Sequence, residues 1–311
     1  MVSCPLCKNS AEKSVLAQTA LVNDAASDLV QCPACGVIYF DPLPSIEILN
    51  RFYSAAYYDF LRWPGEAGGA WFGRKLRKIG PTGRFLDVGC ATGFFLNGIR
   101  QSTDWEVHGV EFGRHAVKYA RQELGLDVLE GDLKDANYPD GYFDYVHVNN
   151  VLEHVLDPAG LLAECHRVLK PNGHFFLAVP NGVNDSRNLI DFFRSENLPA
   201  RSPSGHIFFF PARTLLKLFE QFGFTVRSKK TGSIKRGLRN TGILPKKKNW
   251  KENHFPREDA QVMAGSSVVV NEGNRKSVLY YQYRNFSADM NNLPGLHDFG
   301  LDFLFELTKG M

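Results

Sequence analysis

Residues 84 to 93, Arg-Phe-Leu-Asp-Val-Gly-Cys-Ala-Thr-Gly, constrain the fold of this chain more than any other stretch. A short run of Phe, Leu and Val encloses one carboxylate, Asp87, and glycines follow at Gly89 and Gly93. An apolar helical pattern then starts at Phe94. This order predicts a buried strand, a tight glycine-rich turn and a helix N-terminus, which together form the first half of a nucleotide-binding βαβ unit.

The chemistry of this turn indicates the kind of ligand that it would take. Glycine has no Cβ, so the backbone at Gly89 and Gly93 can approach a bound molecule closely. Asp87 places a negative charge where a phosphate would be repelled, and it suits a cationic group such as an amino acid ammonium. The turn therefore favours an aminoacyl nucleoside over a dinucleotide. The alternative is an ordinary strand-to-helix corner that binds no ligand. The residues that follow the turn distinguish the two.

The chain after this turn alternates regularly between strand and helix patterns. Five βα units within about 100 residues predict an α/β fold with a doubly wound, Rossmann-like sheet, which binds its ligand at the carboxyl ends of the strands. The predicted strands cover 85–88, 106–110, 127–129, 142–148, 175–179 and 224–229, and the predicted helices cover 93–101, 114–124, 158–169 and 212–222.

Polar residues follow the predicted strands at the expected ligand edge. Glu111 lies 24 residues after Asp87, and a carboxylate at that place offers two oxygens to two vicinal ribose hydroxyls. Asp132 and Asn149 end the next two strands. The sequence therefore places a row of acceptors along one edge of the sheet.

Several motifs together resemble class I S-adenosylmethionine (SAM) dependent methyltransferases over roughly residues 1 to 230. The glycine-rich turn is similar to the family's DxGxGxG motif, with Ala91 in place of the middle glycine, which adds only a methyl group. The motifs that carry the resemblance are Phe85-Leu-Asp-Val-Gly, Gly109-Val-Glu111, Glu130-Gly-Asp132, Val151-Leu-Glu-His-Val-Leu-Asp-Pro158 and Leu169-Lys-Pro-Asn-Gly-His-Phe175.

The resemblance implies SAM as cofactor and a set of residues that contact it. In the family, an acidic residue at the place of Asp132 accepts from the adenine amino group. The implied cofactor contacts are Asp87, Gly89, Cys90, Gly93, Glu111, Phe112, Asp132, Leu133 and Asn149. A double CxxC pattern followed by a Pro-rich link resembles bacterial members that modify sugars or small metabolites.

Four of the six cysteines form two CxxC pairs, Cys4-Pro-Leu-Cys7 and Cys32-Pro-Ala-Cys35. Two such turns can direct four thiolates at one point and complete a closed tetrahedral site. We therefore expect residues 1–40 to form a zinc ribbon in which Zn²⁺ is structural. A redox dithiol or chance spacing is the alternative.

Two histidines are candidates for a general base in methyl transfer. His154 follows Glu153 after the fourth strand, and His206 lies in a loop that the resemblance places at the same cleft. Ubiquinone-pathway and small-RNA methyltransferases carry ExxEH here and bind a divalent ion with a further histidine. Asn150 replaces the first acidic residue of that pattern, so we expect no catalytic metal.

The remaining segments are assigned more coarsely. Residues 41–80 are expected to be a linker and helical lid, in which Tyr57 and Tyr58 either cover the cofactor or simply pack on the core; 81–230 is the catalytic core. The polar stretch 184–204, with three arginines, either reads a phosphate or is a solvated loop. Within 231–311, the last strand is expected at 266–271 or 277–284. The apolar tail from residue 296 is expected to dock on the core or on a second subunit, as in a homodimer.

Charge and hydropathy bound the partners and the location. Ten basic residues and no acidic ones lie between Glu220 and Glu252, and Trp250 adds an aromatic to this basic segment, 227–251. No apolar run approaches the roughly 18 residues that span a bilayer, and no leader pattern opens the chain, which predicts a cytoplasmic protein. We expect methylation of O or C of a small metabolite, such as a sugar or nucleotide-linked sugar. An RNA-binding protein or RNA methyltransferase is the alternative.

Overall fold

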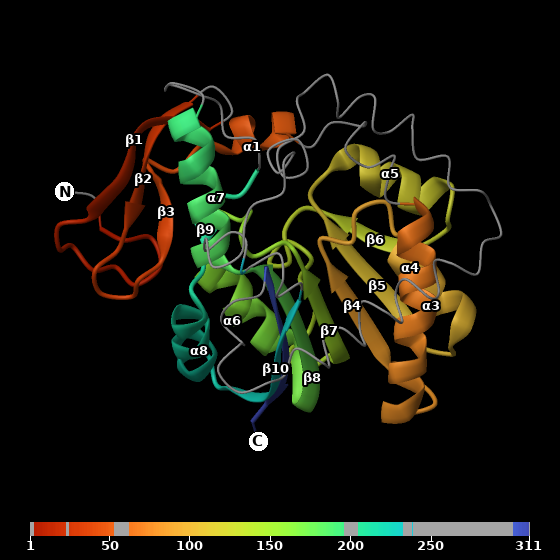
Figure 1. Cartoon of the computed structure of the whole chain (residues 1–311). Coiled ribbons are helices and arrows are strands. Elements are labelled where there is room, and N and C mark those ends of the chain that lie inside the picture. The colour runs from red at the N-terminus through yellow and green to blue at the C-terminus, as the bar shows by residue number, and fades with distance from the viewer. Residues whose placement is uncertain are drawn as a thin grey trace.

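The computed structural model describes residues 3–22, 25–52, 62–195, 205–232, 238 and 301–310. These residues form two sheets with helices on both sides of the larger one (Figure 1). No helix among them is both long and apolar enough to cross a membrane. The tyrosines expected on a lid, Arg201 and most of the basic segment 227–251 lie outside the described residues.

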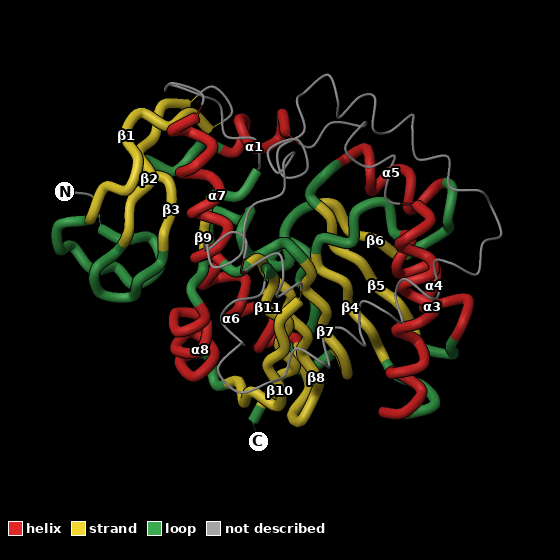
Figure 2. The backbone as a smooth tube through the Cα atoms, viewed as in Figure 1, coloured by secondary structure: helices red, strands yellow, loops and turns green. Residues whose placement is uncertain are grey.

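The larger sheet has seven strands in the order β10-β11-β8-β7-β4-β5-β6 (Figure 2). Its central strands are parallel, and the chain leaves β4 toward β5 and β6 and returns to β7 and β8 on the other side. This confirms the predicted doubly wound sheet. The strands are β4 (Arg84–Val88), β5 (Glu106–Glu111), β6 (Asp127–Glu130), β7 (Phe143–Asn149), β8 (Leu169–Pro180), β10 (Phe224–Gly232) and β11 (Asp302–Lys309).

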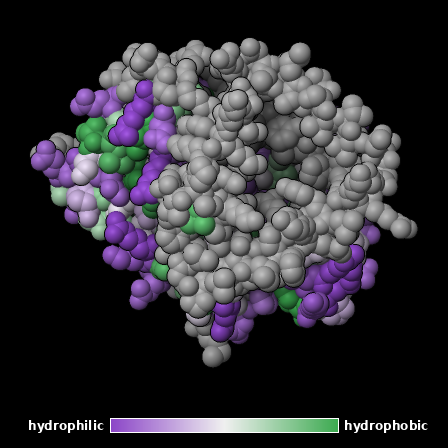
Figure 3. All heavy atoms as spheres, viewed as in Figure 1, coloured by the Kyte–Doolittle hydropathy of each residue, from purple (hydrophilic) through white to green (hydrophobic). Residues whose placement is uncertain are grey.

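Helices cover both faces of this sheet because alternate strand residues point to opposite sides. Phe85 packs in one buried cluster with residues of α3, α4 and α5, while Leu86 packs in the other with residues of α6 and α8 (Figure 1). The helices are α1 (Ile46–Phe52), α3 (Arg62–Ile79), α4 (Phe94–Ser102), α5 (Arg114–Gln122), α6 (Pro158–Val168), α7 (Gly182–Ser195) and α8 (Ala212–Gln221). In Figure 3 the described side chains where α3 and α4 end are mainly hydrophilic.

Helices α3 and α4 approach each other unusually closely. A Cβ placed on Gly69 would lie 2.0 Å from the carbonyl oxygen of Phe95, and one placed on Gly98 would lie 2.2 Å from that of Glu66. Three glycines on α3, Gly65, Gly69 and Gly73, recur every fourth residue and so share one helix face. Close backbone packing therefore binds α3 to the layer that follows the glycine-rich turn.

The smaller sheet joins the N-terminal segment to the rest of the chain. Its order is β1-β2-β3-β9. The strands β1 (Ser14–Val22) and β2 (Ala25–Gln31) lie between the CxxC pairs, and β3 (Ile38–Asp41) follows the second pair. The fourth strand, β9 (Phe208–Phe209), lies just before α8 in the chain and pairs antiparallel with β3. The N-terminal sheet is therefore completed by a segment far along the chain.

The C-terminal segment supplies an internal strand of the larger sheet. β11 lies between β10 and β8 and is antiparallel to both. The expectation that the tail docks on the core is confirmed for 301–310, where Phe303, Phe305 and Leu307 are buried. The two segments expected to hold the last strand, 266–271 and 277–284, lie outside the described residues, and β11 occupies the place between β10 and β8.

The expectation of a loop from residue 184 is wrong, because α7 covers Gly182–Ser195. The polar side chains of Asn184, Ser186 and Asn188 are buried, so this helix packs partly through polar residues. Arg187 and Arg194 lie on its exposed surface.

Candidate functional site

The glycine-rich turn after β4 has the left-handed backbone that its composition requires. Gly89 has φ +71° and Gly93 has φ +80°. A Cβ at Gly89 would lie 2.4 Å from Cγ2 of Val151, so glycine is also needed for packing against the segment after β7. The turn thus brings two strand ends close together before any ligand is considered.

Ala91, which replaces the middle glycine, adopts the left-handed region with φ +50°. For a residue with a Cβ this conformation costs roughly 1–2 kcal/mol. The backbone N–H of Ala91 donates to Oε2 of Glu111 at 2.9 Å, which helps to hold the strained turn. Alanine at this position therefore adds a conformational cost as well as a methyl group.

Glu111 joins the turn after β4 to the turn after β5. Its other oxygen, Oε1, accepts from the backbone N–H of Gly113 at 2.7 Å, and the residue is buried. A carboxylate has about four acceptor positions, so both oxygens can accept further hydrogen bonds. The residue expected to bind a ribose is thus also a structural link between two strand ends.

Asp87 has a partner that the sequence analysis missed. Oδ1 of Asp87 lies 2.7 Å from Nδ1 of His147, and both residues are buried. The two are direct neighbours in the parallel pairing of β4 with β7. A histidine inside the apolar run 143–148 was the available signal, since a buried polar residue in a central strand needs a partner.

The other residues expected to contact the cofactor differ in what they expose. Cys90 and Leu133 are buried, whereas Phe112 is 45% exposed. Asp132 is exposed, and its Oδ1 accepts from the backbone N–H of Asp135 at 3.0 Å. Asn149 is the exposed last residue of β7. With Asp87 next to the last residue of β4 and Glu111 at the end of β5, these residues lie at or just after the carboxyl ends of β4, β5, β6 and β7.

Glu153, His154 and His206 converge beside this edge, as the sequence predicts. Each offers a ligand atom, and these atoms lie within 4.8 Å of one another. Nδ1 of His154 lies 2.9 Å from the carbonyl oxygen of Gly205, and Nδ1 of His206 lies 2.7 Å from Oδ2 of Asp185. Both imidazoles are therefore oriented through Nδ1, and Nε2 of His154 lies 3.7 Å from Oε1 of Glu153.

Glu153 is the most buried member of this cluster. It is 1% exposed, and neither of its carboxylate oxygens has a hydrogen-bond partner among the described residues. Its backbone carbonyl accepts from the N–H groups of Ile207 and Phe208 at 2.9 and 3.1 Å, which ties it to the segment after His206. A buried carboxylate in this state is costly unless it is protonated or faces a bound cation.

The three groups have strongly perturbed acidities. Burial raises the pKa of Glu153 to about 7, although the charge on His206 acts in the opposite direction. Burial and the charge on His206 lower the pKa of His154 to about 3. Burial would lower the pKa of His206, but Asp185 and Glu153 outweigh it and raise that pKa to about 9. Near neutral pH, His154 is neutral, His206 is charged and Glu153 is close to its midpoint.

Comparison with known proteins matches residues 69–229, more than half of the chain, to a family model described as a methyltransferase domain. This chain belongs to the methyltransferase domain family. The methyltransferase domain so defined contains every residue named at the strand ends and every member of the Glu153 cluster. It begins within α3, which agrees with the close packing of α3 on α4.

Two curated relatives resemble parts of this domain. A probable S-adenosylmethionine-dependent methyltransferase of Mycolicibacterium smegmatis is 31% identical over 102 residues, covering 32% of this chain and 39% of the relative. A ubiquinone biosynthesis O-methyltransferase of Proteus mirabilis is 30% identical over 128 residues, covering 39% of this chain and 48% of the relative. The chain thus spans less than half the length of either relative.

A solved structure resembles the fold over most of the chain. The phosphoethanolamine N-methyltransferase 2 of Haemonchus contortus, in complex with S-adenosyl-L-methionine, has a TM-score of 0.51 and 16% identity. The match covers 88% of this chain and 62% of the other. At this identity the likeness shows the shared fold alone.

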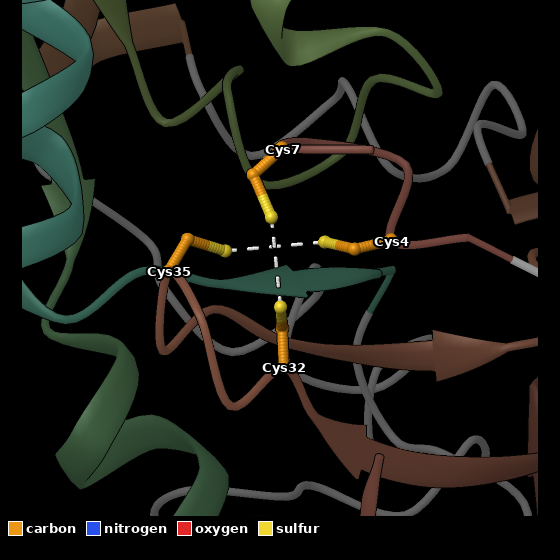
Figure 4. Close-up of side chains that lie close together, drawn as sticks. All are labelled: Cys4, Cys7, Cys32 and Cys35. Atoms are coloured by element: carbon orange, nitrogen blue, oxygen red, sulfur yellow. Dashed lines mark hydrogen bonds between the residues drawn. The ribbon is translucent and has the colours of Figure 1, made fainter. Parts of the chain in front are cut away.

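The four paired cysteines lie outside the matched methyltransferase domain and gather at one point (Figure 4). Sγ of Cys7 lies 3.6 Å from Sγ of Cys32, and Sγ of Cys4 lies 3.9 Å from Sγ of Cys35. All four sulfur atoms lie within 4.8 Å of one another. The hydrogen bond from Cys35, opposed by burial, lowers the pKa of Cys4 to about 5, which favours a thiolate there.

Proposed function

We propose that this protein is a SAM-dependent methyltransferase. The observation that carries the proposal is the row of carboxylates Asp87, Glu111 and Asp132 at the carboxyl ends of three adjacent parallel strands, beside a left-handed glycine turn. Such a row offers acceptors to an ammonium group, a ribose and an adenine amino group in turn. The relative named as S-adenosylmethionine-dependent supports the same cofactor.

The residues at the carboxyl ends of β4, β5, β6 and β7 have distinct tasks in this proposal. Asp87 and the backbone of Gly89, Cys90 and Gly93 hold the amino acid end, and Glu111 with Phe112 holds the ribose. Asp132, the backbone at Leu133 and Asn149 enclose the base. SAM supplies an already activated methyl group when bound, so the chain mainly has to align donor and acceptor.

Among Glu153, His154 and His206, Glu153 is the best candidate for the general base. A base works best when its pKa lies near the working pH, and the pKa of Glu153 is raised to about 7. His154 accepts protons poorly because its pKa is lowered to about 3. His206, charged and paired with Asp185, would act as the cation that stabilises the Glu153 carboxylate.

A divalent ion is the competing explanation for the same three residues. Their close approach favours it, whereas Asn150 in place of a carboxylate removes one negative ligand. We therefore keep Glu153 as a general base that acts without a bound metal ion. Methyl transfer that stops in EDTA and returns with magnesium, while the cysteine site keeps its metal, would reverse this assignment.

We further propose that the four cysteines hold a structural zinc ion. Zn–S bonds of about 2.3 Å in a tetrahedron place the sulfur atoms about 3.8 Å apart. The pairs Cys7–Cys32 and Cys4–Cys35 lie 3.6 and 3.9 Å apart. Four thiolates fill the coordination sphere, so the ion would stabilise the N-terminal sheet and leave no position for a substrate.

The acceptor is proposed to be O or C of a small metabolite, such as a sugar or nucleotide-linked sugar. The relative named as an O-methyltransferase supports oxygen as the acceptor atom. RNA is the alternative, and it depends on the basic segment, of which Arg227, Lys229 and Lys230 lie on β10. RNA binding should weaken steeply with added salt, and metabolite binding should not. A cytoplasmic location and a homodimer stay predictions from the sequence.

The direct test is incubation of the purified protein with methyl-labelled SAM and a metabolite extract, followed by mass spectrometry. We expect one small molecule to gain the label and the mass of a CH2 group. The Glu153→Gln variant serves as the matched control and should leave that product at a small fraction of its amount. Label that appears only in added RNA would favour the alternative.

A further inference from the structure

The pair Asp87–His147 is built into the sheet beneath the glycine-rich turn. β4 and β7 run parallel with Asp87 opposite His147, so the two side chains share one face of the sheet. Nδ1 of His147 lies 2.7 Å from Oδ1 of Asp87, and the side chains are only 6% and 7% exposed. The imidazole can therefore donate to the carboxylate in a site that excludes most water.

Aromatic rings hold this imidazole from both sides. The ring of Phe95 on α4 stacks on His147 with centroids 4.7 Å apart and 17° between the planes, and that of Phe176 on β8 stacks at 4.9 Å and 7°. Phe72 on α3 meets the edge at 5.4 Å. Side chains from three separate elements thus enclose the ring, and rotation about its side-chain bonds would break both stacks.

Apolar packing alone does not account for histidine at this position. A third phenyl ring would fill the same space without burying polar nitrogen atoms, whose burial costs free energy unless they are hydrogen-bonded. Asp87 imposes the need for a donor, because a carboxylate inside the strand must be satisfied. The enclosed imidazole gives it one fixed hydrogen bond through Oδ1.

We propose that His147 is a positioning residue that fixes the Asp87 carboxylate, with Oδ2 directed to the ammonium group of an S-adenosyl amino acid ligand. This inference rests on the proposed function. The hydrogen bonds found among the described residues use Oδ1 of Asp87 and leave Oδ2 for a ligand. A carboxylate held in one rotamer loses little further freedom on binding, so more of the contact energy appears as affinity.

The test compares two ligands that differ in the ammonium group. S-adenosylhomocysteine carries the amino acid end, and 5′-methylthioadenosine lacks it. Titration calorimetry of His147→Phe should show the affinity for S-adenosylhomocysteine falling about tenfold, the effect expected for losing one hydrogen bond that orients a charged group. The affinity for 5′-methylthioadenosine should change by less than about twofold on the same scale.

Two further variants separate positioning from folding. His147→Asn keeps a donor nitrogen near the place of Nδ1 and should restore most of the lost affinity. Phe176→Leu removes one stacked ring but keeps the hydrogen bond, and it should produce a smaller loss confined to S-adenosylhomocysteine. If His147→Phe does not fold, these two variants carry the test between them. Asp87→Asn combined with His147→Phe should lose no more than Asp87→Asn alone.

The outcomes distinguish this inference from the proposed function. A wild-type protein that binds neither ligand contradicts both. A wild-type protein that binds S-adenosylhomocysteine, with His147→Phe binding it equally well, keeps the proposed function and overturns the positioning role. Equal losses for the two ligands in every variant would assign His147 to general stability instead.

Discussion

The ring of Tyr39 stacks on the ring of Phe208 with centroids 6.0 Å apart, where β3 of the N-terminal sheet pairs with β9. His206 lies two residues before Phe208, and the backbone N–H of Phe40 donates to the carbonyl of Ile207. On the other side, Ile207 and Phe208 donate to the Glu153 carbonyl. The cysteine-rich segment thus supports the loop that brings His206 to Glu153.

This relationship predicts the effect of removing the proposed zinc ion. Chelation under reducing conditions should loosen β3, and the amides of Ile207 and Phe208 should then exchange with solvent about tenfold faster or more. Amides of β5, such as Val107, serve as the internal control and should not change. S-adenosylhomocysteine should bind as before, since its proposed contacts lie at the ends of β4 to β7 and not on β3 or β9. Unchanged exchange at 207 and 208 in zinc-free protein would show that the ribbon does not support this loop.

Substitution of the proposed base should separate catalysis from cofactor binding. Glu153→Gln keeps the volume of the buried side chain and removes its proton-accepting form, so kcat should fall roughly 10²- to 10⁴-fold. The affinity for SAM should stay within about twofold of wild type. Glu220→Gln, on the exposed surface of α8, is the matched control and should leave both quantities unchanged. A Glu153→Gln variant with wild-type kcat assigns the base elsewhere.

The rate should depend on pH through the same carboxyl. Because burial raises the pKa of Glu153 to about 7, kcat/KM should rise with pH and level off above that value. An ordinary carboxylate would give no rise above about pH 5. The profile is measured from about pH 5.5 to 8.5 in a constant-ionic-strength buffer. A flat profile over this range argues against Glu153 as the titrating group.

Stability should depend on pH through His206 and Asp185. The folded pKa of His206, raised by Asp185 to about 9, exceeds the unfolded value of 6.5, so this stabilisation is complete below 6.5 and is lost as pH rises through about 9. The free energy of unfolding in urea should therefore fall between pH 7 and 9. Asp185→Asn should begin lower and fall less. Parallel curves for the two proteins would exclude this linkage.

The glycine-rich turn permits a paired test of backbone strain and packing. Gly89→Ala should destabilise strongly, because the residue needs φ +71° and its Cβ would lie 2.4 Å from Val151. Gly125→Ala shares a positive φ of +61° but would meet no heavy atom of the described residues within 4 Å, so only about 1 kcal/mol is expected. Adding Val151→Ala should recover part of the loss at Gly89 alone. Equal losses at both glycines would remove the packing argument.

The part of the fold from β4 to β8 was predictable because each of its elements has a local signature. Strands such as 175–179 are apolar and end at turn residues. The helix α6 begins just after Asp157, whose side chain caps it by accepting from the backbone N–H of Gly160. Register in a parallel sheet then places the strand-end acceptors along one edge. The cysteine cluster was predictable for a similar reason, since CxxC spacing is itself local.

The missed features depend on contacts between distant segments. β11 joins the sheet some 70 residues after β10, and the pairing of β3 with β9 has no local signal in either strand. The packed face of α7 includes the buried side chains of Asn184, Ser186 and Asn188, and a polar stretch of this kind favours a loop in the sequence. His147 reads as an irregularity in an apolar strand until the pairing of β4 with β7 puts Asp87 beside it.

The central claim is that the carboxylate edge binds SAM, and calorimetric titration of SAM into wild-type protein and Asp87→Asn tests it most directly. Asparagine can still accept the hydrogen bond from His147, so the variant should fold and lose mainly the negative charge. We expect one SAM to bind per wild-type chain, and we expect the affinity for SAM to be at least about tenfold lower in Asp87→Asn. Wild-type protein that does not bind SAM, or a variant that binds it equally well, would contradict the account.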